Sequence, residues 1–101
     1  ILSSMPFENA FHFHIGINQY SGVYANSLND FCDKIQKIDL KSIEFHLSRK
    51  DFELWLRSLG DLELAKRMES VRDMGLSGEN LRKKVYETVK SRCEELAELT
   101  K

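Results

Sequence analysis

The chain has 101 residues, of which 42% are hydrophobic and 31% are charged, and its formal net charge is -1. This length fits one domain with one core, and the composition excludes an intrinsically disordered chain. The near-neutral charge excludes a global electrostatic attraction to nucleic acid or to an anionic membrane, and no apolar run approaches the roughly 18 residues of a membrane span.

The first residues contain no basic region followed by an apolar stretch, so we expect no signal peptide and a cytoplasmic protein. Met5 is a candidate natural start, which would make Ile1–Ser4 a remnant of expression. Two interpretations of residues 1–10 stay open, disorder or an origin partly outside the natural chain. Cys32 and Cys93 belong to no CxxC pair, so we expect reduced thiols rather than a disulfide or a zinc site.

An alternating segment near the N-terminus predicts a half-buried β-strand. Phe11, Phe13, Ile15 and Ile17 alternate with polar residues or glycine, and a period of two is typical of a strand. The following residues Tyr20–Gly22 indicate a turn or loop. The sequence offers no second strand with which this segment would pair.

A strand without a partner leaves backbone donors and acceptors unmet on both edges. Either it lies over the helices as an extended arm, or it pairs with the same segment of a second chain across a two-fold axis. Because a row of four exposed apolar side chains would be an aggregation hazard, we favour a homodimer with this segment in its interface.

Five helices are predicted from apolar residues at helical spacing. The first begins after the N-cap Ser27, with Asp30 in its first turn, and the second follows Asp39. The third ends before Gly60, and Asp61 caps the fourth. The apolar stripes of these four helices are Leu28, Phe31, Cys32, Ile35 and Ile38; Leu40, Ile43 and Leu47; Phe52, Trp55, Leu56 and Leu59; and Leu64, Ala65, Met68 and Val71.

Residues 73–78 break the helical pattern, and the fifth helix runs from about Glu79 to near Thr100. The basic residues of this helix lie near its N-terminus and its acidic residues near its C-terminus, an order that the helix dipole disfavours. Tertiary packing must therefore stabilise this helix. Residues 1–101 are therefore predicted to form one mainly α-helical domain. It is a compact bundle of about five helices with a long C-terminal helix and an N-terminal extended segment or single strand.

The order of several residues also matches a known family. They are Ile15-Gly16, Ser21-Gly22, Ala25, Ser27-Leu28 and Phe31, then Ile38-Asp39, Ser42–His46, Asp51–Glu53, Trp55, Leu59–Asp61 and Glu63–Ala65. This pattern resembles an uncharacterised prokaryotic domain family, mostly archaeal in its short form, over about Ile15 to Ala65. The resemblance implies no activity, because none is established for the family, and no catalytic residue is carried over.

The three histidines are candidate functional residues. His12 and His14 lie on the same face of the predicted strand, where they are either solvated or, with His46, ligands of a metal ion. His46 falls near the end of a helix, where the dipole favours positive charge, and within reach of Asp51 or Glu53. A structural role is favoured for His46, which is also a candidate binding residue.

A basic cluster marks the start of the last helix. The glycine-containing turn Gly75–Gly78 precedes Arg82, Lys83 and Lys84, and such a turn into a helix N-terminus can hold an anion. The P-loop pattern is absent, however. A solvated basic turn, with the three side chains facing the solvent in the main, is the favoured interpretation.

The sequence contains no recognisable nucleophile–base set, metal signature or cofactor loop. No cofactor is therefore expected, and we favour a non-enzymatic binding or protein-interaction module. Its expected partners are a second copy and an unidentified protein, rather than nucleic acid or a membrane. The alternative is anion or nucleic-acid binding through Arg82–Lys84, and a third hypothesis is a small metal-dependent enzyme that uses His12, His14 and His46.

Overall fold

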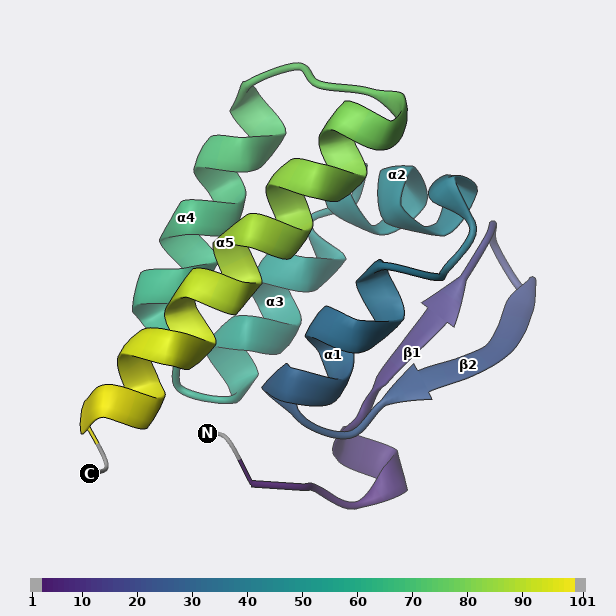
Figure 1. Cartoon of the computed structure of the whole chain (residues 1–101). Coiled ribbons are helices and arrows are strands. Elements are labelled where there is room, and N and C mark those ends of the chain that lie inside the picture. The colour runs from purple at the N-terminus through teal and green to yellow at the C-terminus, as the bar shows by residue number, and fades with distance from the viewer. Residues whose placement is uncertain (1–2, 100–101) are drawn as a thin grey trace.

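The computed structural model describes residues 3–99, and its elements are shown in chain order in Figure 1. A short 3-10 turn, η1 (Phe7–Asn9), precedes strands β1 (Phe11–His14) and β2 (Tyr20–Ala25). The helices within these residues are α1 (Leu28–Ile35), α2 (Leu40–Ser48), α3 (Asp51–Ser58), α4 (Leu62–Asp73) and α5 (Gly78–Leu99). The predicted mainly α-helical bundle with a long C-terminal helix is confirmed.

The predicted N-caps Ser27 and Asp61 and the predicted glycine after α3 are confirmed. The helix α1 ends at Ile35, before the predicted stripe residue Ile38, and the predicted end of α5 near Thr100 lies outside the described residues. The Ser27 hydroxyl accepts a hydrogen bond from the Asp30 backbone N–H at 3.0 Å, and the Asp61 carboxylate accepts one from Leu64 N–H at the same distance. Each bond satisfies a donor that the first turn of a helix leaves free. Gly60 has a φ of 87° after α3, a left-handed conformation that favours glycine at this position.

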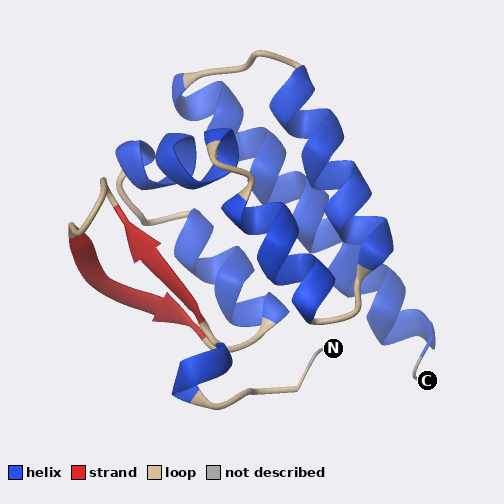
Figure 2. Ribbon diagram, turned by 180° about the vertical axis from the view of Figure 1, so that it is seen from behind, coloured by secondary structure: helices blue, strands red, loops and turns tan. Residues whose placement is uncertain are grey.

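One core joins the helices to the hairpin. In Figure 1, α5 lies between α4 and α1, and in Figure 2, from behind, the hairpin flanks one side of the bundle. The predicted core residues Phe52, Trp55 and Leu56 are buried together with the other helical stripes. The Trp55 ring stacks on Phe31 with centroids 5.2 Å apart, so the predicted register of α3 is confirmed.

The prediction of a single strand is wrong, because β1 pairs antiparallel with β2. Phe11 lies opposite Ala25 and Phe13 opposite Val23, so the apolar face of β1 is buried as expected. The segment Tyr20–Gly22, predicted to be a turn, is the first half of β2. The sequence signal was misleading because β2 is exposed along most of its length and therefore lacks the alternation that marks a half-buried strand.

The hairpin turn also shortens the predicted strand. The Ile15 N–H donates to the Gln19 carbonyl at 3.0 Å, and the Gln19 N–H donates to Gly16 at 3.1 Å. This tight turn leaves Ile17 72% exposed at the tip instead of buried. The argument for a dimer from an unpaired strand therefore does not hold for β1.

The segment before β1 packs on the bundle from Met5 onward. The Met5 N–H donates to the Asn26 carbonyl at 2.8 Å, and the Trp55 indole N–H donates to the Asn9 carbonyl at 2.9 Å. These contacts join Met5 and Asn9 to the start of α1 and to α3. Of the segment interpreted as an expression remnant, Ile1 and Leu2 lie outside the described residues.

The unfavourable charge order of α5 is offset by contacts with α4. Arg67 of α4 makes a bidentate pair with Glu95, at 2.7 and 2.9 Å. Arg92 reaches the fully buried Asp61 carboxylate at 3.1 Å. Glu95, one of the acidic residues late in α5, thus pairs across the interface with α4, where packing also stabilises the helix. Among the helices of residues 3–99, none is long and apolar enough to cross a lipid bilayer.

Candidate functional site

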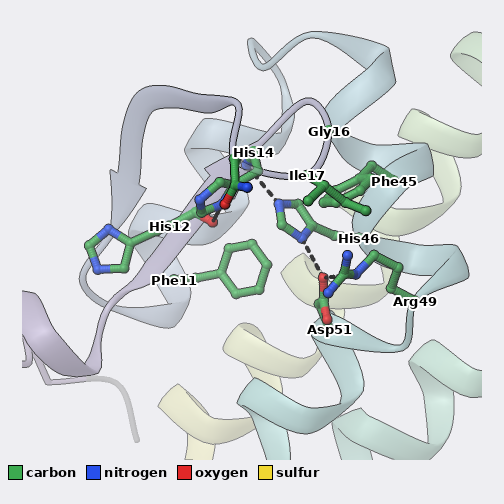
Figure 3. Close-up of a pocket in the computed structure, with 10 residues that line it drawn as sticks. Phe11, His12, His14, Gly16, Ile17, Phe45, His46, Arg49 and Asp51 are labelled. Atoms are coloured by element: carbon green, nitrogen blue, oxygen red, sulfur yellow. Dashed lines mark hydrogen bonds and ion pairs between the residues drawn. The ribbon is translucent and has the colours of Figure 1, made fainter.

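The candidate site is a hollow of about 350 Å³ between the hairpin and the connection from α2 to α3 (Figure 3). Its lining comes from β1, the hairpin turn, α2 and the start of α3. The residues are Phe11, His12, His14, Gly16, Ile17, Asn18, Phe45, His46, Arg49 and Asp51. All three histidines therefore border the same hollow, although they come from two distant parts of the chain.

His46 is held at the back of this hollow by two hydrogen bonds. Its Nε2 accepts from the backbone N–H of His14 at 2.8 Å, and its Nδ1 lies 2.8 Å from the Asp51 carboxylate. A backbone N–H can only donate, so Nε2 carries a lone pair and Nδ1 carries the proton. Figure 3 shows His14, His46 and Asp51 joined in this order. Of the two partners predicted for His46, Asp51 bonds to it, whereas Glu53 pairs with Arg72 at 2.9 Å.

The short connection between α2 and α3 brings Asp51 to His46. Lys50 has a φ of 68°, and this left-handed residue lets α3 begin directly after α2 ends. Arg49 then lies beside Asp51, with 3.3 Å between its Nε and the Asp51 carboxylate. Its guanidinium also covers the Phe45 ring at 4.8 Å from the centroid, a cation–π geometry. The wet rim of the hollow is therefore formed by a paired cation and anion.

Burial is the largest influence on the pKa of His46. Only 3% of the residue is exposed, and desolvation lowers this pKa below its ordinary value of 6.5, while the bond to Asp51 opposes the shift. The imidazole is consequently neutral at physiological pH. Because its lone pair is already occupied by the His14 N–H, His46 is unavailable as a general base or a metal ligand in this arrangement.

His12 and His14 occupy the outer face of the hairpin and bond to nearby groups. The His12 Nε2 donates to the Phe7 carbonyl at 2.8 Å, and the His14 Nδ1 donates to the His12 carbonyl at 3.0 Å. Both residues are half-buried, so the prediction of a fully solvated face is only partly correct. Within the described part of the chain, no three His, Cys, Asp or Glu residues form a group that could hold a metal ion.

A second feature of this region was not predicted from the sequence. Phe7, His12, His14, Tyr20 and Tyr24 form a row of contacting rings, which we call the aromatic face. The centroid distances are 4.5 Å for Phe7–His12, 4.9 Å for Phe7–Tyr24, 5.7 Å for His12–Tyr20 and 5.2 Å for His14–Tyr20. Its members come from η1 and both strands, so only the pairing of the hairpin brings them together.

Three of the five members of the aromatic face, Phe7, Tyr20 and Tyr24, are exposed, whereas His12 and His14 are half-buried. Ten large hydrophobic side chains are exposed among residues 3–99, and five of them lie between residues 7 and 24. Tyr20 is 45% exposed and Tyr24 is 38% exposed. Tyrosine combines a large apolar area with a polar hydroxyl, a property that enriches it at protein interfaces. The concentration of such residues on one small hairpin points to a contact surface.

The basic cluster at the start of α5 lies outside the hollow and is not uniformly solvent-facing. Arg82 donates to the Ile35 carbonyl at 2.6 Å and to Glu79 at 3.0 Å, so the prediction of solvent exposure is wrong for Arg82. This bond satisfies a carbonyl at the end of α1 that has no helical partner. Lys83 is exposed and Lys84 is half-buried.

The two cysteines lie in a separate hollow between α1 and α5. Both thiols are free and buried. Burial is the main cause that raises the pKa of Cys32 to about 11 and also raises the pKa of Cys93. Because the thiolate is the reactive form, neither cysteine is an activated nucleophile.

Comparison with known proteins identifies a protein family. The model of a family described as a family of unknown function (DUF5752) matches residues 4–90. No curated protein and no solved structure matches the chain. The matched range includes the hollow, the aromatic face and most of the core.

Proposed function

The chain belongs to the family of unknown function DUF5752, and from this premise we propose that it is a non-enzymatic protein-interaction module. Its binding surface is the aromatic face, and its ligand is an extended segment of a partner protein. The observation that carries this proposal is the exposure of three aromatic side chains of this face, Phe7 of η1 and Tyr20 and Tyr24 of β2, which are 60%, 45% and 38% exposed. Aromatic residues, tyrosine in particular, supply much of the binding energy at protein interfaces.

An extended segment is favoured because β2 is an edge strand. Within residues 3–99 the sheet consists of the two strands β1 and β2, and β2 is the strand farther from the helices in both Figure 1 and Figure 2. An extended peptide adds to such an edge through main-chain hydrogen bonds, and side chains beside the edge select its sequence. Tyr20 and Tyr24 flank this edge and would contact alternate side chains of the bound segment.

The state of the candidate catalytic groups favours binding over catalysis. Both nitrogens of His46 are used within the fold, and burial raises the pKa of both cysteines. The free thiols support a location in the reducing cytoplasm. Anion binding at the start of α5 has less support, because Arg82 already donates hydrogen bonds to the Ile35 carbonyl and to Glu79. Metal-dependent chemistry also has less support, because the His14 N–H occupies the lone pair of His46 Nε2 that would bind a metal ion.

Selection from a displayed library of short random peptides tests the proposal. The library is first depleted on a Tyr20→Ser/Tyr24→Ser variant and then selected on the unaltered protein. A matched control carries Leu54→Ser and Leu62→Ser, which remove two exposed apolar side chains from α3 and α4. We expect peptides that bind the unaltered protein and the control and that shift the amide NMR signals of residues 20–25. Peptides that bind all three proteins equally, or none, would refute the proposal.

A further inference from the structure

We infer that the position of the hairpin depends on pH. When the His46 imidazole takes up a second proton, the turn end of the hairpin, residues 14–22, is released from the helices. His14 and Tyr20 lie in this turn end and belong to the aromatic face, so its release disrupts the surface that binds the partner segment. This second step, the loss of binding, rests on the proposed function, whereas the release itself does not.

One hydrogen bond fastens the turn end to the helices. Within the part of the chain that the structure describes, the bond from the His14 N–H to His46 Nε2, at 2.8 Å, is the only hydrogen bond between residues 14–22 and a helix (Figure 3). The turn end is otherwise bonded within the hairpin. The opposite end of the hairpin is held independently, because Phe11 and Phe13 are buried in the core.

An irregularity in the sheet lets the turn end move separately from the rest of the hairpin. Phe13 lies opposite Val23, but the next residue, His14, lies opposite Tyr20. The two residues between Tyr20 and Val23 are therefore not paired across the ladder, and one of them, Gly22, has a φ of 83°. A left-handed glycine at a break in the ladder can absorb a change in backbone direction. Opening at this point leaves the regular part of the ladder in place.

The closed hairpin has no acceptor for a second proton on His46. Nδ1 already carries a proton, which it donates to the Asp51 carboxylate at 2.8 Å, so the second proton binds to Nε2. The His14 N–H points at the same atom. Two donors that face each other repel, and each is left without an acceptor in a buried place. In the open hairpin, water accepts from both groups, so the imidazolium favours the open form.

The surroundings of His46 preserve this effect. Uncharged rings from β1, α2 and α3 contact the imidazole, namely those of Phe11, Phe13, Phe45 and Phe52. Of the titratable and charged neighbours, Asp51 favours the imidazolium, while His14 and Arg49 disfavour it. Burial is the largest influence, and the pKa of His46 in the closed form lies below its ordinary value of 6.5. Release of the turn end exposes the ring to water, which returns this pKa toward the ordinary value.

The difference in pKa between the two forms sets the size of the effect. The open form takes up the proton at a higher pH than the closed form, so acidification favours opening. Below about pH 6.5, each further pH unit raises the ratio of open to closed molecules by up to about tenfold, until the closed form is protonated as well. Above about pH 6.5, His46 is neutral in both forms and the ratio does not change through this residue.

Amide hydrogen exchange, followed by NMR from about pH 7.5 to about pH 5, tests the release. Protection factors correct for the intrinsic dependence of exchange on pH. The His14 amide should be less protected than the amides of the buried Val71 in α4 and Val89 in α5. Its protection should fall by up to about tenfold per unit below about pH 6.5. This loss should be absent in His46→Gln, which cannot take up the proton, and present in the control His12→Ala.

Three results would overturn the release. Equal protection of the His14 amide and the two core amides would show that only unfolding of the whole domain exposes it. A protection of the His14 amide that stays constant with pH would show that no titration is linked to its opening. A loss of protection that is the same in His46→Gln would assign the linked proton to another residue.

The peptides selected on the aromatic face test the loss of binding. Between about pH 7.5 and about pH 5, their dissociation constant should rise by a larger factor for the unaltered protein than for His46→Gln, because they bind the closed form. Equal factors for the two proteins would overturn the control of binding by His46. A selection that yields no peptide would refute the proposed function and this step with it, while hydrogen exchange would still decide the release.

Discussion

Substitution of His46 should destabilise the fold and remove a specific pH dependence. His46→Ala removes the acceptor of the His14 N–H and the donor to Asp51. A buried donor without a partner costs about 1–3 kcal/mol. The bond to Asp51 adds about 1 kcal/mol, because this carboxylate is 25% exposed and water replaces part of the loss. The ring also packs on Phe11, with centroids 4.8 Å apart, so its removal adds about 1–2 kcal/mol.

The expected total is therefore about 3–6 kcal/mol, a large part of the roughly 5–15 kcal/mol that stabilises a typical domain. His46→Gln is the informative partner variant. Its amide oxygen extends to the former position of Nε2, can accept from the His14 N–H and does not titrate. We expect it to cost less than His46→Ala. The matched control is His12→Ala, which removes an imidazole from the outer face and should cost no more than about 1 kcal/mol.

The pH dependence follows from the lowered pKa of His46. As the pH falls below about 6.5, the unfolded chain takes up the proton before the folded chain does. The unfolding free energy should therefore decrease over this window and level off below the folded pKa. Above about 6.5 both states are neutral at His46, and this residue contributes no slope.

Urea denaturation at a series of pH values, from about 7.5 to about 5, measures both effects. The two proteins differ only at residue 46, so the difference between their pH profiles isolates the contribution of His46. We expect the advantage of the unaltered protein over His46→Gln to shrink as the pH falls. An advantage that grows on acidification would show that His46 is stabilised as the cation, and the assignment of its proton to Nδ1 alone would be wrong.

Three further predictions concern stability and use the same denaturation assay. Trp55→Ala should cost about 3–5 kcal/mol because it deletes a buried aromatic ring, and an unchanged midpoint would contradict its place in the core. Arg82→Glu should lower the unfolding free energy by about 1–3 kcal/mol, because it leaves the Ile35 carbonyl at the end of α1 without its donor. The control Lys83→Glu/Lys84→Glu should change the unfolding free energy by no more than about 0.5 kcal/mol. Equal losses in the two variants would argue against the Arg82 bond. Ser42 has a buried hydroxyl with no hydrogen-bond partner among residues 3–99, so Ser42→Ala should be neutral or stabilising by up to about 1 kcal/mol. A marked loss of stability would reveal an unrecognised partner.

The helices were predictable because their signals are local. Ser27 and Asp61 precede apolar stripes at helical spacing, and the bonds that cap these helices span only three residues. The bond between His46 and Asp51 was predictable for a similar reason, since the two residues are five positions apart. In each case a short stretch of sequence contains both partners.

The hairpin and the aromatic face were not predictable in the same way. Tyr20–Gly22 combines a serine and a glycine and resembles a turn, and β2 carries no buried alternation that would reveal a strand. The contact from His14 to His46 spans 32 positions, and the Arg82 bond to Ile35 spans 47. Such contacts follow from how elements pack, and no local pattern encodes them.

The first residues pack on helices that lie much later in the sequence, and this order affects how the chain folds during synthesis. His14 is 32 residues ahead of the side chain that satisfies its N–H, and Asn9 is 46 residues ahead of Trp55. At a synthesis rate of roughly 5–20 residues per second, the later partners leave the ribosome about 2–9 seconds after the hairpin. During this interval Phe11 and Phe13 have no core to enter. We expect nascent chains halted before α3 to bind chaperones through this segment, and chains extended through α5 to release them.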